Sequence, residues 1–180
     1  MLKKIVFLSG GLALSAAPVL AQSAYTSYND WTGGYIGAQL GYADVGTSLD
    51  GVDGDDIIGG IIAGYDYDLG DWVVGGGLDY DMASIDLSGA AEVENVIRAK
   101  VRAGYKMNNG LLYATAGWAR ADTDTLGDSD GYLFGIGYDV KMSGGYTVGT
   151  ELLYHKFDDF NDTGIDVDAT TIQFRVGYNF

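Results

Sequence analysis

His155 is the only histidine in this chain of 180 residues and the residue best suited to acid–base chemistry. Asp158 and Asp159 follow it closely and could orient its imidazole ring. Acyl transfer would also need a nucleophile, and the residue two positions after the histidine is Phe157. The chain has no cysteine, which removes thiol catalysis and metal–thiolate sites. We therefore predict a protein that is not an enzyme and needs no cofactor, with its histidine at the rim of the fold.

Charged residues recur at every second position in several segments, and this spacing places them on one face of a β-strand. One segment carries Arg98, Lys100 and Arg102, an unusual run of three cations on a single face. Burying such charges is costly unless opposite charges lie beside them, so we expect a network of ion pairs. The expected partners, at opposite positions of neighbouring strands, are Asp79 with Lys100, Asp81 with Arg98, and Glu151 with Arg175.

Acidic residues gather between the alternating segments, mainly in the ranges 44–56, 86–94, 122–130 and 158–168. They form either a hydrated, repulsive rim or a site for divalent cations. Asp53, Asp55 and Asp56 are the calcium candidates, but their spacing matches no EF-hand loop. The whole chain has 25 acidic and 10 basic residues and a formal net charge of -15, which argues against a nucleic-acid partner.

The first residues have the pattern of a secretory leader. Lys3 and Lys4 precede an apolar stretch, and small residues end at Ala21. The predicted organisation is a cleaved signal peptide at 1–21, a lead-in at 22–33 and a folded barrel domain at 34–180. Trp31 in the lead-in is expected at the membrane edge or as a partial plug. No later stretch is apolar for long enough to form a membrane-spanning helix, so a membrane-bound fold must use closed strands.

The rest of the chain alternates apolar and polar residues with a period of two, which predicts strands with one apolar face. Eight such segments are present: 34–44, 57–68, 72–83, 95–106, 111–121, 131–141, 146–157 and 169–180. Short turns alternate with longer loops between them, as in even-stranded barrels that cross a membrane. The pattern therefore predicts an all-β fold, an eight-stranded antiparallel up-and-down transmembrane β-barrel.

Aromatic residues lie near both ends of the predicted outward faces, where the two surfaces of a membrane would be. The facing of segment 111–121 is ambiguous, because Tyr113 competes with Trp118, and we place Trp118 outward. The expected interfacial aromatics are Tyr65, Tyr67, Trp72, Tyr80, Tyr105, Trp118, Tyr132, Tyr138 and Tyr154.

The end of the chain alternates down to an aromatic terminal residue, through Phe174, Val176, Tyr178 and Phe180. With the run from Trp31 to Gly37 and repeated Gly-Tyr pairs, this order resembles small eight-stranded outer-membrane barrels of the OmpA, OmpX and opacity type. The resemblance covers the whole mature chain. It implies export to the outer membrane of a Gram-negative bacterium and insertion by the barrel-assembly machinery, which would recognise the alternating terminal residues.

Three functions remain compatible with these features. The first is a structural or surface-interaction role in the envelope, with the lumen closed by the ion-pair network. The second is a narrow minor porin for small solutes or ions, because inward glycines such as Gly75 and Gly137 free volume in the lumen. The third is an adhesin that acts through its acidic loops. In each case we expect a monomer in contact with outer-membrane lipid and lipopolysaccharide, with divalent cations as candidate loop partners.

Overall fold

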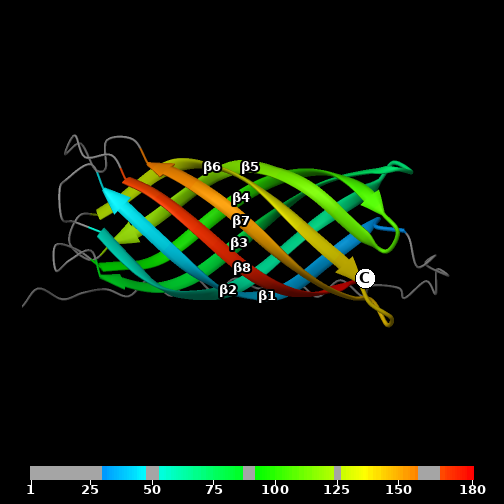
Figure 1. The fold of residues 1–180 in the computed structure, drawn as a ribbon, viewed down its shortest axis with the longest axis horizontal. Coiled ribbons are helices and arrows are strands. Elements are labelled where there is room, and N and C mark those ends of the chain that lie inside the picture. Colours follow the sequence, from blue (N-terminus) through cyan, green and yellow to red (C-terminus); the bar gives the residue numbers. More distant parts are fainter. Residues whose placement is uncertain (1–29, 48–52, 87–91, 124–126, 158–166) are drawn as a thin grey trace, which may run out of the picture.

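The computed structural model describes residues 30–47, 53–86, 92–123, 127–157 and 167–180. Within these ranges the chain is a closed barrel of antiparallel strands (Figure 1). The strands are β1 (Gly33–Thr47), β2 (Asp53–Asp68), β3 (Trp72–Asp86), β4 (Glu92–Met107), β5 (Gly110–Thr123), β6 (Gly127–Lys141), β7 (Tyr146–Phe157) and β8 (Val167–Asn179). Each strand pairs with its neighbours in sequence, and β8 pairs with β1. The predicted eight-stranded up-and-down barrel is confirmed.

The barrel has two distinct ends. The terminal end carries residue 30, the carboxyl terminus and the connections 69–71, 108–109 and 142–145 (Figure 1). Tight turns at this end use residues that tolerate positive φ, with values of 103° at Gly70 and 56° at Asn108. At the other end, which we call the loop end, β1, β3, β5 and β7 finish and β2, β4, β6 and β8 begin. The described parts of the chain contain no helix that is long and apolar enough to cross a membrane.

The strands continue further toward the loop end than the sequence predicts. β1 reaches Thr47 instead of Asp44, and β4 begins at Glu92 instead of Asn95. The predicted β1 stops at the outward Asp44, which is acidic. The backbone ladder nevertheless continues, because inward residues such as Val45 remain apolar and buried. The long loops of the prediction are therefore partly strand.

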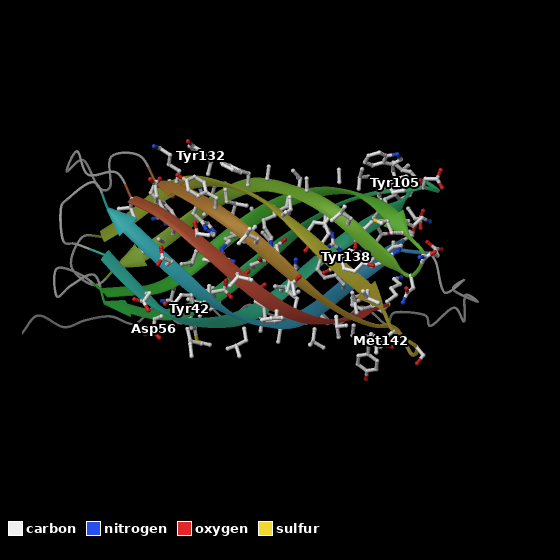
Figure 2. All side chains as sticks on the ribbon, in the orientation of Figure 1. Tyr42, Asp56, Tyr105, Tyr132, Tyr138 and Met142 are labelled. Carbon is white, nitrogen blue, oxygen red and sulfur yellow. The ribbon has the colours of Figure 1, made fainter. Side chains whose placement is uncertain are left out.

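The outward and inward faces agree with the predicted alternation. Apolar residues such as Leu78 and Phe174 are well exposed on the outer wall, at 62% and 65%. On β5, Trp118 is exposed and Tyr113 is buried, so the outward placement of the tryptophan is confirmed. The predicted interfacial aromatics all belong to the outward face, and Tyr132 lies toward the loop end (Figure 2).

Inward glycines allow close approach of strands around the filled lumen. A Cβ atom at Gly37 on β1 would lie 2.3 Å from the carbonyl oxygen of Val176 on β8, the strand that closes the barrel. At the outward Gly76 on β3, the nearest atom to such a Cβ would lie at 3.4 Å.

We expect Gly37→Ala to weaken closure of the barrel, because the backbone of β8 must move to admit the methyl group. The expected loss of stability is about 1–3 kcal/mol. The folded fraction can be measured after refolding in detergent micelles, from the electrophoretic mobility of unheated samples. Gly76→Ala serves as the control and should fold like the unchanged protein. Equal folded fractions for the two variants would contradict the prediction.

Candidate functional site: the filled lumen

Apolar side chains fill the lumen at the loop end. This layer, which we call the apolar plug, consists of Ala43, Val45, Ile58, Ala119, Ala121, Leu133, Leu153, Phe157 and Val167. Each of these residues is at most 8% exposed. Because water loses hydrogen bonds and ions lose hydration in an apolar passage, the layer closes this end of the lumen. This layer was not predicted from the sequence, although the period of two already placed Leu133 and Leu153 inward.

An ionic layer lies next to the apolar plug and is centred on β4. Arg98 reaches β3, with Nη2 2.6 Å from Oδ2 of Asp81 and Nη1 3.6 Å from Oδ2 of Asp79. Lys100 Nζ lies 2.6 Å from the same Asp79 oxygen and 2.6 Å from Oε2 of Glu151 on β7. The expected contacts of Asp79 with Lys100 and of Asp81 with Arg98 are therefore present.

Glu151 joins two cations that come from different strands. Its Oε1 lies 3.0 Å from Nη1 of Arg175 on β8, while its Oε2 contacts Lys100. Arg175 Nη1 also donates a hydrogen bond of 2.8 Å to the hydroxyl of Tyr113 on β5. All four side chains are buried. The third expected contact, between Glu151 and Arg175, is thus also present.

Arg102 is the third cation of β4 and lies toward the terminal end. Its Nε donates to Asp66 on β2 and its Nη1 to Asp139 on β6, both at 2.9 Å. Its guanidinium carbon lies 4.9 Å from the ring centroids of both Tyr35 and Tyr113, so it is held between two aromatic rings. No partner for this arginine was predicted from the sequence. The inward positions of Asp66 and Asp139 in the period-two pattern are the signal that could have found them.

The predicted registers were wrong even though the predicted ion pairs form. Asp79 lies opposite Arg98 instead of Lys100, and Asp81 lies opposite Val96. Glu151 likewise lies opposite Gln173 instead of Arg175. The ion pairs are diagonal, which long charged side chains can span. A hairpin register depends on where the strands end, and these strands extend further than their hydropathy indicates.

Two glutamines complete the ionic layer around Asp81. Gln39 Nε2 donates to Oδ1 at 2.9 Å, and Gln173 Nε2 donates to Oδ2 at 3.2 Å. Gln173 Oε1 in turn accepts a hydrogen bond of 3.3 Å from Arg98. These contacts satisfy carboxylate lone pairs that a buried ion pair would otherwise leave open. The predicted network contained only charged residues and so included neither glutamine.

The lead-in residues close the terminal end of the lumen, and we call residues 30–32 the lead-in cap. Trp31 is 1% exposed and packs in a cluster with Val73 and Leu111. Its backbone N–H donates to Oδ2 of Asp68 at 2.9 Å, and Lys141 Nζ lies 4.9 Å from its ring centroid. Trp31 was expected either at the membrane edge or as a partial plug of the barrel. In the structure it blocks the terminal end of the lumen.

His155 lies inside the lumen, so the prediction of a rim histidine was wrong. It is 2% exposed, and its ring stacks parallel to that of Phe157 with centroids 6.4 Å apart. The neighbouring strands β6 and β8 continue past it toward the loop end, which places it within the filled interior. Asp158 and Asp159, the residues expected to orient its ring, lie outside the described residues.

The calcium candidates do not converge within the described residues. Asp55 and Asp56 are consecutive on β2, and consecutive strand residues point to opposite faces. Asp55 accepts a hydrogen bond from the hydroxyl of Tyr42, and Asp56 Oδ1 accepts one of 2.6 Å from the backbone of Ile57 (Figure 2). The side chain of Asp53 lies outside the described set. Among described side chains, no group of three or more potential ligands could hold a metal ion.

Comparison with known proteins places this barrel among outer-membrane proteins. Residues 11–180 match the family described as Outer membrane protein beta-barrel domain. The chain is 30% identical over 219 residues to the 31 kDa outer-membrane immunogenic proteins of Brucella melitensis biotype 1 and Brucella suis biovar 1, covering 97% of this chain and 87% of theirs. The solved structure of Neisserial surface protein A has a TM-score of 0.59 at 18% identity, covering 83% of this chain and 98% of that one. This likeness shows a common fold.

We expect Glu151→Gln to destabilise the barrel strongly, because it leaves Lys100 and Arg175 buried with less opposing charge. Removing one partner of a buried ion pair costs about 3–5 kcal/mol. Equilibrium unfolding in urea, followed by tryptophan fluorescence in micelles, measures the change. Asp130→Asn is the matched control, because Asp130 is exposed and its oxygen lies 3.8 Å from Arg120. This control should cost less than about 1 kcal/mol, and similar losses in both variants would refute the assigned role of Glu151.

Proposed function

This chain belongs to the outer membrane protein β-barrel family, and on that premise we propose that it serves the Gram-negative envelope as a closed, non-conducting structural barrel. One observation carries the proposal: the apolar plug, the ionic layer and the lead-in cap occupy the lumen in succession. A barrel of eight strands leaves an interior that side chains can fill. The protein then acts through its outer wall and its loop end.

Two small cavities among the described residues of the lumen support a closed barrel. One cavity near Arg102 and Arg175 has a volume of about 20 Å³, and a second has about 10 Å³. A water molecule needs roughly 10–15 Å³, so each cavity has room for about one. Gly75 and Gly137, which favoured a pore, are packed closely instead: a Cβ at Gly137 would lie 2.3 Å from the hydroxyl of Tyr113. The large inward side chains take up the volume that inward glycines leave.

The outer wall supports contact with outer-membrane lipid and lipopolysaccharide as the protein's main partners. Apolar residues cover its middle, and tyrosines near the loop end donate hydrogen bonds to polar neighbours. Tyr154 donates to Asp168 at 2.8 Å, and Tyr80 donates to Asn95 at 3.0 Å. Tyrosine suits this position because its ring is apolar and its hydroxyl is polar. By the usual orientation of such barrels, the loop end faces outward and the terminal end faces the periplasm.

The terminal strand supports recognition by the barrel-assembly machinery. Phe174, Val176, Tyr178 and Phe180 are all exposed on the outer wall, at 45–66%. Phe180 also holds the seam of the barrel, since its backbone exchanges hydrogen bonds of 2.9 and 3.1 Å with Gly34. The side chains of these residues face away from the lumen, where a binding protein can reach them.

A non-enzymatic role fits the surroundings of the only histidine. His155 lies among the apolar side chains Leu153 and Phe157 on its own strand and is almost fully buried. A general base must come within hydrogen-bond reach of the proton that it removes. A substrate at the membrane surface would not reach this imidazole while the apolar plug is in place.

We expect no discrete conductance steps when the purified barrel is reconstituted into planar bilayers, because all three layers block the lumen. Arg98→Gln and Asp79→Asn should be equally silent, since each changes only the ionic layer. The measurement is single-channel current under an applied potential, with a general porin as positive control. Discrete steps whose size or ion selectivity changes in either variant would support the minor porin instead.

We expect deletion of the gene to increase the sensitivity of the cells to detergent, and the unchanged barrel to restore resistance. A variant with Asp44 and Asp130 changed to asparagine separates the wall from the acidic loop end, because these side chains are exposed and outward. Under the structural role, this variant should restore resistance as well as the unchanged protein does. Failure of the variant, at equal abundance in the membrane, would favour a surface-interaction role.

A further inference from the structure

A small cavity lies at the terminal end of the lumen, beside the lead-in cap and the ionic layer. Its lining includes Trp31, Tyr35, Arg102, Asp139, Thr147 and Arg175, and its volume is about 20 Å³. The second cavity, of about 10 Å³, shares Tyr35, Arg102 and Arg175 with it. This space is enough for one water molecule and too small for a larger solute.

Three lining residues have a buried polar atom without a hydrogen-bond partner among the residues that the structure describes. These atoms are Nε1 of Trp31, Nε of Arg175 and Oδ1 of Asp139. Each of the three residues is at most 5% exposed, so bulk solvent does not reach them. Two of the atoms are donors and one is an acceptor. Buried groups of this kind are satisfied in almost all proteins, by protein or by ordered water.

We infer that this cavity binds one structural water molecule, which accepts hydrogen bonds from Trp31 and Arg175 and donates one to Asp139. A water molecule offers two acceptor and two donor positions, and buried waters typically make about three hydrogen bonds. An anion would match the two donors but would meet the carboxylate of Asp139. The site therefore suits a neutral ligand that both donates and accepts.

The bound water joins parts of the chain that are far apart in sequence. Trp31 belongs to the lead-in cap, Asp139 to β6 and Arg175 to β8. The cap is already held through its backbone by Asp68 and through its ring by Lys141. The water adds a third connection, between the indole N–H and the ionic layer. This inference does not depend on whether the barrel conducts.

Gly177 provides a way to displace the water. It lines the cavity, and the nearest atom to a Cβ built on it would lie 3.7 Å away. Gly149 also lines the cavity but has no such room, because its Cβ would lie 2.0 Å from Oδ1 of Asp139. An alanine methyl group at position 177 therefore fits between the protein atoms and takes space from the water.

The first test detects the water directly. In the refolded barrel in micelles, the indole N–H of Trp31 should give a nuclear Overhauser cross-peak at the water frequency, assigned by its loss in Trp31→Phe. Gly177→Ala should abolish this cross-peak and leave the indole signal itself in place. Absence of the cross-peak in the unchanged protein, or its persistence in Gly177→Ala, overturns the inference. A shift of the indole signal on titration with sodium chloride identifies an anion instead and also overturns it.

The second test uses stability, with Gly76→Ala on the outer wall as the matched control for replacing a strand glycine. Losing the water leaves buried donors without partners, so Gly177→Ala should melt about 2–4 °C below the unchanged barrel. Gly76→Ala should melt at or above the unchanged barrel. If Gly177→Ala instead melts as high as Gly76→Ala, the methyl group has filled a dry space and the inference is wrong.

Discussion

The buried cations of β4 are the constraint on which the interior of this barrel depends. Arg98, Lys100 and Arg102 point into the lumen from one strand, and their carboxylate partners come from four others: β2, β3, β6 and β7. An uncompensated charge in this interior would cost far more than a single lost contact. The strands must therefore be arranged so that all three cations find partners at once. The ion pairs connect opposite walls of the barrel, which backbone pairing between neighbouring strands cannot do.

The layers on either side of the ion pairs strengthen the electrostatic attraction by excluding water. The apolar plug excludes water from the loop end, and Trp31 covers the terminal end. Electrostatic attraction is stronger in such an environment than in water, and so is the penalty for an unpaired group. Filling the lumen therefore stabilises the barrel and removes a continuous path for solutes. A protein built in this way presents its wall and its loop end to the surroundings.

The ion pairs and the register differ in how far they could be predicted. The contact between Asp79 and Lys100 follows from the facing of two neighbouring strands, because opposite charges buried on adjacent walls must meet. The register does not follow, because it depends on strand ends that lie beyond the last apolar outward residue. Gln39 and Gln173 illustrate another limit. Their amides become part of the ionic layer only through the three-dimensional arrangement around Asp81.

By itself, the sequence determined the number of strands and the facing of all but the fifth, because a period of two is a local property. Only the tertiary structure decided what fills the lumen. Closure brings Val45, Leu133 and Phe157 from three different strands into one apolar plug, buries His155 and places Trp31 across the terminal end. These contacts join residues far apart in the chain. They depend on the curvature and register of the closed sheet, which no local pattern specifies.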